Sequence, residues 1–99
     1  MIVNIYTKDR LYLKCEAVSV TLPCTDGELC VMNGHMPLVA SVMNGRLKIR
    51  TGPGDEDIKI FSIGNGFATV KNNNVMIYVN RFSNAEFRIG KSPEERTDI

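Results

Sequence analysis

One stretch near the middle of the chain reads Asp26-Gly27-Glu28-Leu29-Cys30-Val31-Met32-Asn33-Gly34-His35-Met36-Pro37-Leu38. Asp26-Gly27 and Asn33-Gly34 are dipeptides that reach positive φ at little cost, so the backbone is predicted to reverse at both places. Between the two turns, residues 29–32 have the apolar character of one short strand. Pro37 lacks an N–H and has a fixed φ, which predicts a rigid connector into the next strand rather than part of a sheet.

The sequence outside this stretch is patterned as short strands. Segments rich in β-branched and aromatic residues alternate with turn signals at about every eight to twelve residues. Residues 17–22 alternate with the period of a half-buried strand, which Pro23 is predicted to end. Asn44-Gly45 predicts a hairpin, and Gly64-Asn65-Gly66 predicts a tight reversal between two strands. The predicted strands are 2–6, 11–13, 17–22, 29–32, 38–42, 46–50, 58–63, 67–71 and 75–79. No apolar helical stripe occurs before Phe82, so we predict an all-β, antiparallel β-sandwich of two sheets with about eight to ten short strands.

The opening stretch also resembles a known family. Gly27-Glu28-Leu29, three further residues and then Asn33-Gly34-His35-Met36-Pro37-Leu38 are similar to the GELG-I-x-PGHAPLL pattern in the N-terminal domain of the epsilon subunit of F-type ATP synthases. The resemblance extends from about Val3 to Phe82. Cys30 stands where the pattern has glycine, and Asn33 stands where it has proline. The resemblance implies a β-sandwich of two sheets, the same fold that the strand pattern predicts.

The end of the chain is predicted to be short and simple. Residues 1–82 are expected to form the epsilon-like domain, and residues 83–99 an irregular tail or one helical turn. Ser92 and Glu95 have the spacing of a capping box, with Pro93 at the first helical position. Longer members of the family continue into a helical hairpin that inhibits ATP hydrolysis and in some members binds ATP. This sequence resembles them without the hairpin, so neither inhibition nor ATP binding is expected.

Composition excludes several classes of protein. The chain has 99 residues and a formal net charge of +1, from 12 basic and 11 acidic residues. A nucleic-acid binder needs clustered cations, so we expect no nucleic-acid partner. Cys15, Cys24 and Cys30 are an odd number at uneven spacing, which is typical of reduced thiols. The apolar runs are far shorter than the roughly 20 residues that span a bilayer, so no direct membrane insertion is expected.

Two groups of residues could carry chemistry. Cys24, Cys30 and His35 suggest the alternative of a small-ligand or metal-binding sandwich, because thiolate and imidazole suit zinc. There is no Cys-x-x-Cys pair and no evident fourth ligand, so we expect no metal, no cofactor and no catalytic residue. Arg46, Lys48 and Arg50 form a basic row, which we interpret as a solvated strand face or a protected edge in preference to a phosphate site.

The family resemblance also implies a function. It suggests a non-catalytic rotor subunit in the central stalk of a proton-translocating F-type ATP synthase, which links gamma to the membrane c-ring and couples rotation to ATP synthesis. Such a subunit lies peripherally on the cytoplasmic side of a bacterial inner membrane. The resemblance places at the c-ring the turn residues Asp26, Gly27, Glu28 and Leu29. It places towards gamma the residues Thr7, His35, Met36 and Ala40. The residues alone leave open a solvated turn without a partner.

Overall fold

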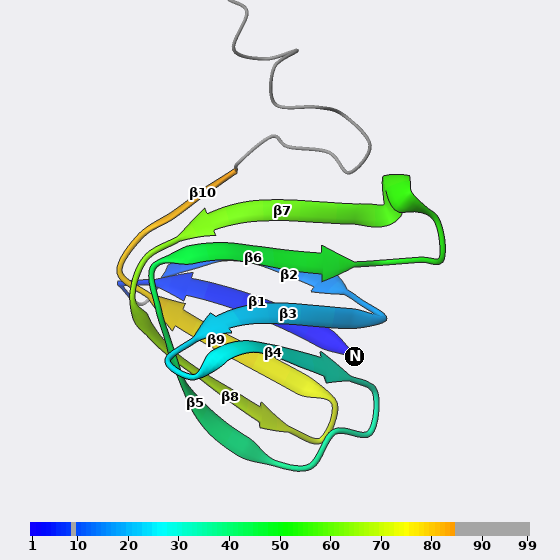
Figure 1. Cartoon of the computed structure of the whole chain (residues 1–99), viewed down its shortest axis with the longest axis horizontal. Helices are drawn as coiled ribbons and strands as arrows, with labels where there is room; N and C mark the ends of the chain where they lie inside the picture. The colour runs from blue at the N-terminus through cyan, green and yellow to red at the C-terminus, as the bar shows by residue number, and fades with distance from the viewer. Residues whose placement is uncertain (9, 85–99) are drawn as a thin grey trace, which may run out of the picture.

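The computed structural model of the chain describes residues 1–8 and 10–84. Its elements are β1 (Ile2–Thr7), β2 (Arg10–Glu16), β3 (Ser19–Cys24), β4 (Gly27–Met32), β5 (Leu38–Val42), β6 (Gly45–Arg50), the short 3₁₀ helix η1 (Asp55–Asp57), β7 (Ile58–Ile63), β8 (Gly66–Lys71), β9 (Asn74–Val79) and β10 (Phe82–Asn84) (Figure 1). Within these residues, no helix has the length and hydropathy that crossing a bilayer requires. The expected helix start at Ser92 lies outside the described residues.

The strands form a sheet that curls over on itself. Hydrogen bonds give the order β10-β7-β6-β3-β5-β8-β9-β1-β2, and β4 pairs with β3 beside this path. β3 and β5 meet at one register pair, Cys24 with Val42, and there the sheet folds into two layers. One layer contains β10, β7, β6, β3 and β4, and the other contains β5, β8, β9, β1 and β2 (Figure 1). The predicted β-sandwich is therefore confirmed.

One strand pair differs in direction from the others. β1 runs parallel to β9, in a register from Ile2 with Asn74 to Tyr6 with Tyr78. Neighbouring pairs such as β1 with β2 and β8 with β9 are antiparallel. A parallel pair needs a long connection between its strands, and here almost the whole sandwich lies between them. The first and last long strands are thus held side by side in one layer.

The space between the layers is filled by apolar side chains. Because successive side chains of a strand point to opposite faces, every second residue faces inward. The fully buried large side chains come from both layers and are Val3, Ile5, Val20, Leu22, Val31, Val42, Leu47, Ile49, Ile63, Val75 and Ile77. At Gly66 the backbones of β8 and β9 approach so closely that a Cβ atom would overlap the carbonyl oxygen of Tyr78. Only glycine fits there without displacing the sheet.

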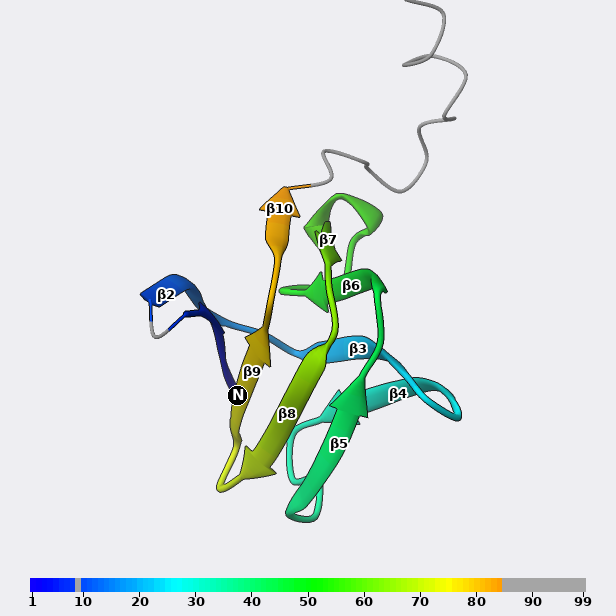
Figure 2. The ribbon, with the colours of Figure 1, turned by 90° about the vertical axis from the view of Figure 1, so that its left-hand side faces the viewer.

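The predicted hairpin at Asn44-Gly45 is wrong. β5 pairs with β8, whereas β6 pairs with β3 and β7, so the chain crosses from one layer to the other at this point. The same is true of the reversal predicted at 64–66, because β7 and β8 belong to different layers. A third crossing joins β9 to β10. Figure 2 shows the three crossings running side by side along one corner of the sandwich.

Polar side chains hold this corner together. The Asn65 side-chain oxygen accepts a hydrogen bond of 2.7 Å from the backbone N–H of Asn44. Arg81 donates to the Asn44 side-chain oxygen at 2.6 Å and to the Ser62 hydroxyl at 3.3 Å. Backbone bonds join Gly64 to Arg81 and Asn80 to Asn65. Each crossing is therefore bonded to the next one. We call this group the corner cluster.

Two further expectations about β3 and β6 are corrected. Pro23 does not end its strand, because β3 continues to Cys24 and pairs with β4 along that length. The missing N–H of Pro23 costs little, because on the side away from β4 its backbone uses the carbonyl oxygen, which accepts a hydrogen bond of 2.8 Å from the Met43 N–H. β6 is not an edge strand, because it has β3 on one side and β7 on the other. The basic row therefore lies on the outer face of an interior strand.

Candidate functional site

The tip of the β3–β4 hairpin is an exposed acidic turn. Gly27 has a φ of 114°, which is the positive value predicted from Asp26-Gly27. Asp26, Gly27 and Glu28 are exposed, whereas Leu29 is partly buried and packs against the core. Figure 2 shows the hairpin extending beyond the other strands. Three of the four residues expected at the c-ring are thus presented to solvent, and Leu29 fixes them to the sandwich.

The charge of this tip acts on a neighbouring thiol. Partial burial, and then the Asp26 carboxylate, raise the pKa of Cys24. Cys24 lies in β3 opposite Gly27, on the face that packs against the core. Cys30 lies on β4 opposite Thr21 and is exposed on the other face. The two thiols therefore do not share a site.

The connector between β4 and β5 holds two of the residues expected at gamma. Gly34 has a φ of 81°, as predicted, and its N–H donates to the Asn73 side-chain oxygen at 2.8 Å. This bond ties the connector to the turn between β8 and β9. Next in the chain, His35 is half-buried, and its Nδ1 lies 2.8 Å from the Met36 carbonyl oxygen. Met36 is 76% exposed, so the connector presents a large apolar side chain to solvent.

The other two residues expected at gamma are less accessible. Thr7 is only 9% exposed at the end of β1. Ala40 is half-buried and lies opposite Ala68 of β8, which is fully buried. Its neighbour Val39 points to the opposite face of β5 and is 75% exposed. The large apolar side chain that β5 exposes to solvent is therefore Val39.

The outer face of the layer that contains β5 carries a row of aromatic rings. Tyr6 of β1 stacks on Tyr78 of β9, with ring centroids 5.0 Å apart, and Phe67 of β8 stacks on Tyr78 at 4.9 Å. Phe67 is 47% exposed, and the register places Val39 diagonally across from it on β5. Met76 lies one pair along β9 on the same side. We call Tyr6, Val39, Phe67, Met76 and Tyr78 the aromatic face.

The aromatic face was not predicted from the sequence. Tyr6, Phe67 and Tyr78 belong to three segments, and each fits an ordinary strand pattern by itself. Only the parallel pairing of β1 with β9 brings Tyr6 beside Tyr78. One signal was present, because each of the three aromatic residues alternates with the inward-facing apolar residues of its strand and therefore points outward. That signal becomes visible only once the inward positions of each strand are known.

The metal-binding alternative gains no support from the arrangement of the side chains. In residues 1–8 and 10–84, no three His, Cys, Asp or Glu side chains are grouped as they would be around a metal ion. His35 lies in the connector, where its ring meets the Met36 backbone. Cys15 is partly buried in β2, and burial raises the pKa of its thiol despite the opposing charge of Lys59. The described cysteines are thus separate thiols in a strand framework.

Comparison with known proteins gives the family of the chain. Residues 1–85 match the family described as "ATP synthase, Delta/Epsilon chain, beta-sandwich domain". The chain belongs to this ATP synthase delta/epsilon family. An ATP synthase epsilon chain from Gloeothece citriformis is 37% identical over 78 residues, which cover 79% of this chain and 54% of that protein. One from a Synechococcus strain is 33% identical over 86 residues, which cover 87% of this chain and 61% of that protein.

Chains of two solved structures share this fold. A chain in the cryo-EM structure of the Euglena gracilis mitochondrial ATP synthase, OSCP/F1/c-ring, superposes with a TM-score of 0.78 at 24% identity, and it covers 99% of this chain and 59% of that chain. A chain in the central stalk/c-ring structure from Tetrahymena thermophila has a TM-score of 0.69 at 20% identity, with 91% and 75% covered. The chain spans 54% and 61% of the two epsilon chains that it matches.

Proposed function

We propose that this delta/epsilon family member is a non-catalytic subunit of the central stalk of a proton-translocating F-type ATP synthase. It binds gamma through the aromatic face and the connector, and it binds the c-ring through the acidic tip of the β3–β4 hairpin. Rotation of the ring is thereby coupled to ATP synthesis in the head of the complex. The subunit is peripheral and lies on the cytoplasmic side of a bacterial inner membrane as part of the complex.

The observation that carries this proposal is the aromatic face. Its stacked rings cross three neighbouring strands, and it continues at β5 into Val39, which is 75% exposed. Monomeric proteins rarely expose large contiguous apolar patches, and aromatic and methionine side chains are enriched where proteins bind one another. Met36 adds a further exposed apolar group at the end of the connector. A flat apolar sheet face of this kind suits a large protein partner better than a small molecule.

The acidic tip supports the second contact. Asp26 and Glu28 are exposed at the end of a projecting hairpin, where carboxylates can pair with basic or polar loops of a partner. Leu29 packs against the core directly behind them. The tip is therefore tied to the rigid body and not to a long loop. A subunit that transmits torque requires such an attachment, because a loose tip would absorb the motion of the ring.

The corner cluster supports the mechanical part of the proposal. It bonds the three crossings between the layers to one another through Asn44, Asn65 and Arg81. Shear of one layer over the other would have to break these bonds together. The two contact surfaces are thus carried by a body that resists deformation. This stiffness is what a rotor part supplies in place of chemistry.

Binding to purified gamma tests the proposal. Val39→Lys places a charge in the aromatic face at a position that is 75% exposed, so the fold should tolerate it. Val18→Lys is the matched control, because Val18 is 47% exposed and lies before β3, away from the aromatic face. We expect Val39→Lys to weaken gamma binding at least about tenfold, the effect of truncating or charging a central contact. The measurement is the dissociation constant by titration calorimetry.

The outcome separates the proposal from its alternatives. Normal binding by the Val18→Lys protein, with loss by the Val39→Lys protein, supports gamma as the occupant of the aromatic face. Equal binding by both variants would contradict that assignment. A wild-type chain that fails to bind gamma at all would contradict the central-stalk function itself. Circular dichroism of both variants confirms that each has kept its strands.

A further inference from the structure

The outer face of the other layer has a hollow with a distinct chemistry. It has a volume of about 210 Å³ and is lined by Ser19, Thr21, Lys48, Arg50 and Ile58. These residues come from three adjacent strands, and the register pairs Ser19 with Arg50 and Thr21 with Lys48 across β3 and β6. Ile58 of β7 pairs with Arg50 from the other side. Across the hollow, the two hydroxyls of β3 therefore lie on one side and the two cations of β6 in the middle. The apolar side chain of β7 lies on the other side.

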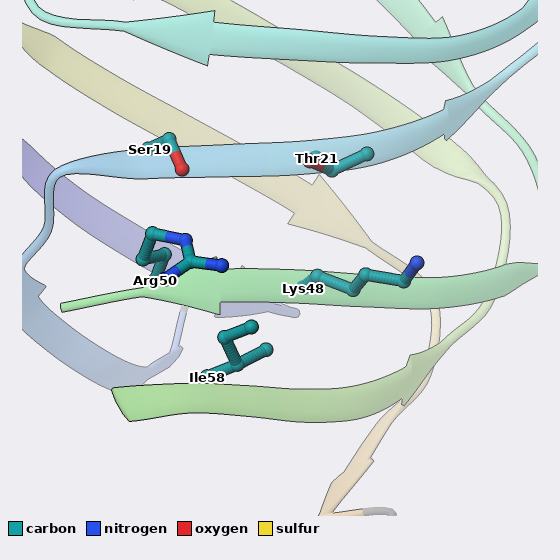
Figure 3. A pocket seen from close by; sticks show the side chains of 5 residues that line it. All are labelled: Ser19, Thr21, Lys48, Arg50 and Ile58. Atoms are coloured by element: carbon teal, nitrogen blue, oxygen red, sulfur yellow. The ribbon is translucent and has the colours of Figure 1, made fainter. Parts of the chain in front are cut away.

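The polar groups of this hollow retain unused hydrogen-bonding capacity. Arg50 donates through one terminal nitrogen to the carbonyl oxygens of Gly52, Pro53 and Gly54, at 3.1, 3.3 and 3.4 Å, and its other nitrogens have no partner in the described chain. Among residues 1–8 and 10–84, the Lys48 ammonium and the hydroxyls of Ser19 and Thr21 have no side-chain hydrogen bond or ion pair. Figure 3 shows the Ser19 hydroxyl directed towards Arg50, with Lys48 extended along β6.

Nearby acidic groups do not neutralise these cations directly. Asp57, in the loop that Arg50 holds, accepts a hydrogen bond of 3.0 Å from the N–H of Gly54. Within the described residues, the N-terminal ammonium forms an ion pair with Glu16, and neither Lys48 nor Arg50 forms one. Arg50 is thus fixed by neutral carbonyl groups, which orient its guanidinium without cancelling its charge. A positively charged hollow with hydroxyl walls remains.

We propose that this hollow binds a small phosphate-bearing anion, either inorganic phosphate or a phosphomonoester. Phosphate oxygens accept from guanidinium, ammonium and hydroxyl groups together, and arginine provides the planar fork that suits them. The Ser19–Arg50 pair and the Thr21–Lys48 pair lie about 7 Å apart along the strands, a distance that the flexible Lys48 side chain can span. This use of the basic row goes beyond the proposed role in the central stalk.

The size and lining of the hollow limit the ligand. Pockets that enclose drug-sized molecules have volumes of about 300–1,000 Å³, and this one is smaller. No aromatic side chain lines it, so no group is present to stack on a nucleobase. A nucleic acid is also disfavoured, because two cations neutralise few phosphates. A single phosphate group fits both the volume and the charge.

Phosphate titration of the ¹⁵N-labelled 99-residue chain tests this inference by NMR. Sodium phosphate is added against sodium chloride of equal ionic strength, because salt alone screens exposed charges. We expect saturable shifts at the amides of Ser19, Thr21, Lys48 and Arg50 with phosphate and none with chloride. A second titration with methyl phosphate identifies the source. Tighter binding of the ester indicates a phosphomonoester, and tighter binding of phosphate indicates the free ion.

Variants that leave the fold intact make the result specific. Lys48→Gln removes a charge that has no ion-pair partner among the described residues, whereas Lys71→Gln removes the same charge at the exposed end of β8. We expect Lys48→Gln to weaken phosphate binding about fivefold, the size of one partly exposed ion pair, with no change for Lys71→Gln. Equal effects of the two variants, or shifts that chloride reproduces, would overturn the proposal. Gamma binding is measured separately, so each proposal can fail alone.

Discussion

The Cys24 thiol at the base of the β3–β4 turn is set between the core and a carboxylate. Partial burial and the Asp26 charge both favour the neutral thiol, so its pKa is higher in the fold than in the unfolded chain. The stabilisation is complete below the ordinary thiol pKa of about 8.5 and is lost as the pH rises through the raised value. Ionisation of Cys24 therefore opposes folding in alkaline solution only.

Alkylation kinetics test this arrangement. In a Cys15→Ser, Cys30→Ser background, only Cys24 reacts with iodoacetamide. Asp26→Asn removes the carboxylate that raises the Cys24 pKa, so more thiolate is present at pH 8 and the rate should rise roughly two- to fivefold. Glu56→Gln, in the exposed loop before β7, is the charge-matched control and should leave the rate unchanged. Identical rates for Asp26→Asn and its parent would show that the carboxylate does not act on the thiol.

At single positions, the backbone conformation of the turns could be predicted from the sequence, whereas the burial of strand side chains could not. Gly27 and Gly34 have the positive φ values expected from the residues before them, because that preference depends on the dipeptide alone. The exposure of Asp26 and Glu28 followed from the same turn. Thr7 could not be recognised as buried, because burial depends on strands far away in the chain. Val39, which is exposed beside the half-buried Ala40, illustrates the same limit.

The corner cluster gives a prediction for the elements that it joins. Arg81→Ala removes the bonds from its guanidinium to Asn44 and Ser62. We expect a loss of about 1–2 kcal/mol in the free energy of unfolding by urea, because several exposed hydrogen bonds disappear together. The amides of Gly64 and Asn80, which bond to neighbouring crossings, should also exchange hydrogen faster.

A surface control shows whether the corner itself is responsible. Lys71→Ala removes an exposed cation at the end of β8 and should change the unfolding free energy by less than about 0.5 kcal/mol. Exchange at Gly64 and Asn80 should stay as in the wild type in that variant. An Arg81→Ala protein as stable as the Lys71→Ala protein would mean that the crossings are held by the core alone.

Strands were predictable here, but their partners were not. Residues 38–42 and 58–63 agree with β5 and β7 because alternation and β-branched residues report local burial. Asn44-Gly45 marks a change of direction correctly, yet the same dipeptide serves a hairpin or a crossing between layers. Which of the two forms depends on whether the next strand finds its partner in the same layer. That choice depends on the whole core and not on the turn residues.

The parallel pair of β1 and β9 joins the N-terminal strands β1 and β2 to the rest of their layer. A chain that ends at residue 73 contains β1 to β8 but lacks the strand that lies between β1 and β8 in the sheet. We expect this truncated chain to have no cooperative thermal transition by circular dichroism, because β1 and β2 lose their only described link to the layer. A chain that ends at Asn84 is the control and should melt cooperatively. Cooperative melting of the shorter chain would contradict this.

The late position of β9 also has a consequence for synthesis. Ile2 leaves the ribosome first, and its partner Asn74 emerges only after 72 further residues have been added. At about 5–20 residues per second, the apolar first strand waits for several seconds before it can dock. During that interval Val3 and Ile5 are available to chaperones or to a neighbouring nascent chain. Slowing the ribosome between the codons of β1 and those of β9 would therefore lower the yield of folded protein, whereas slowing it after β9 would not.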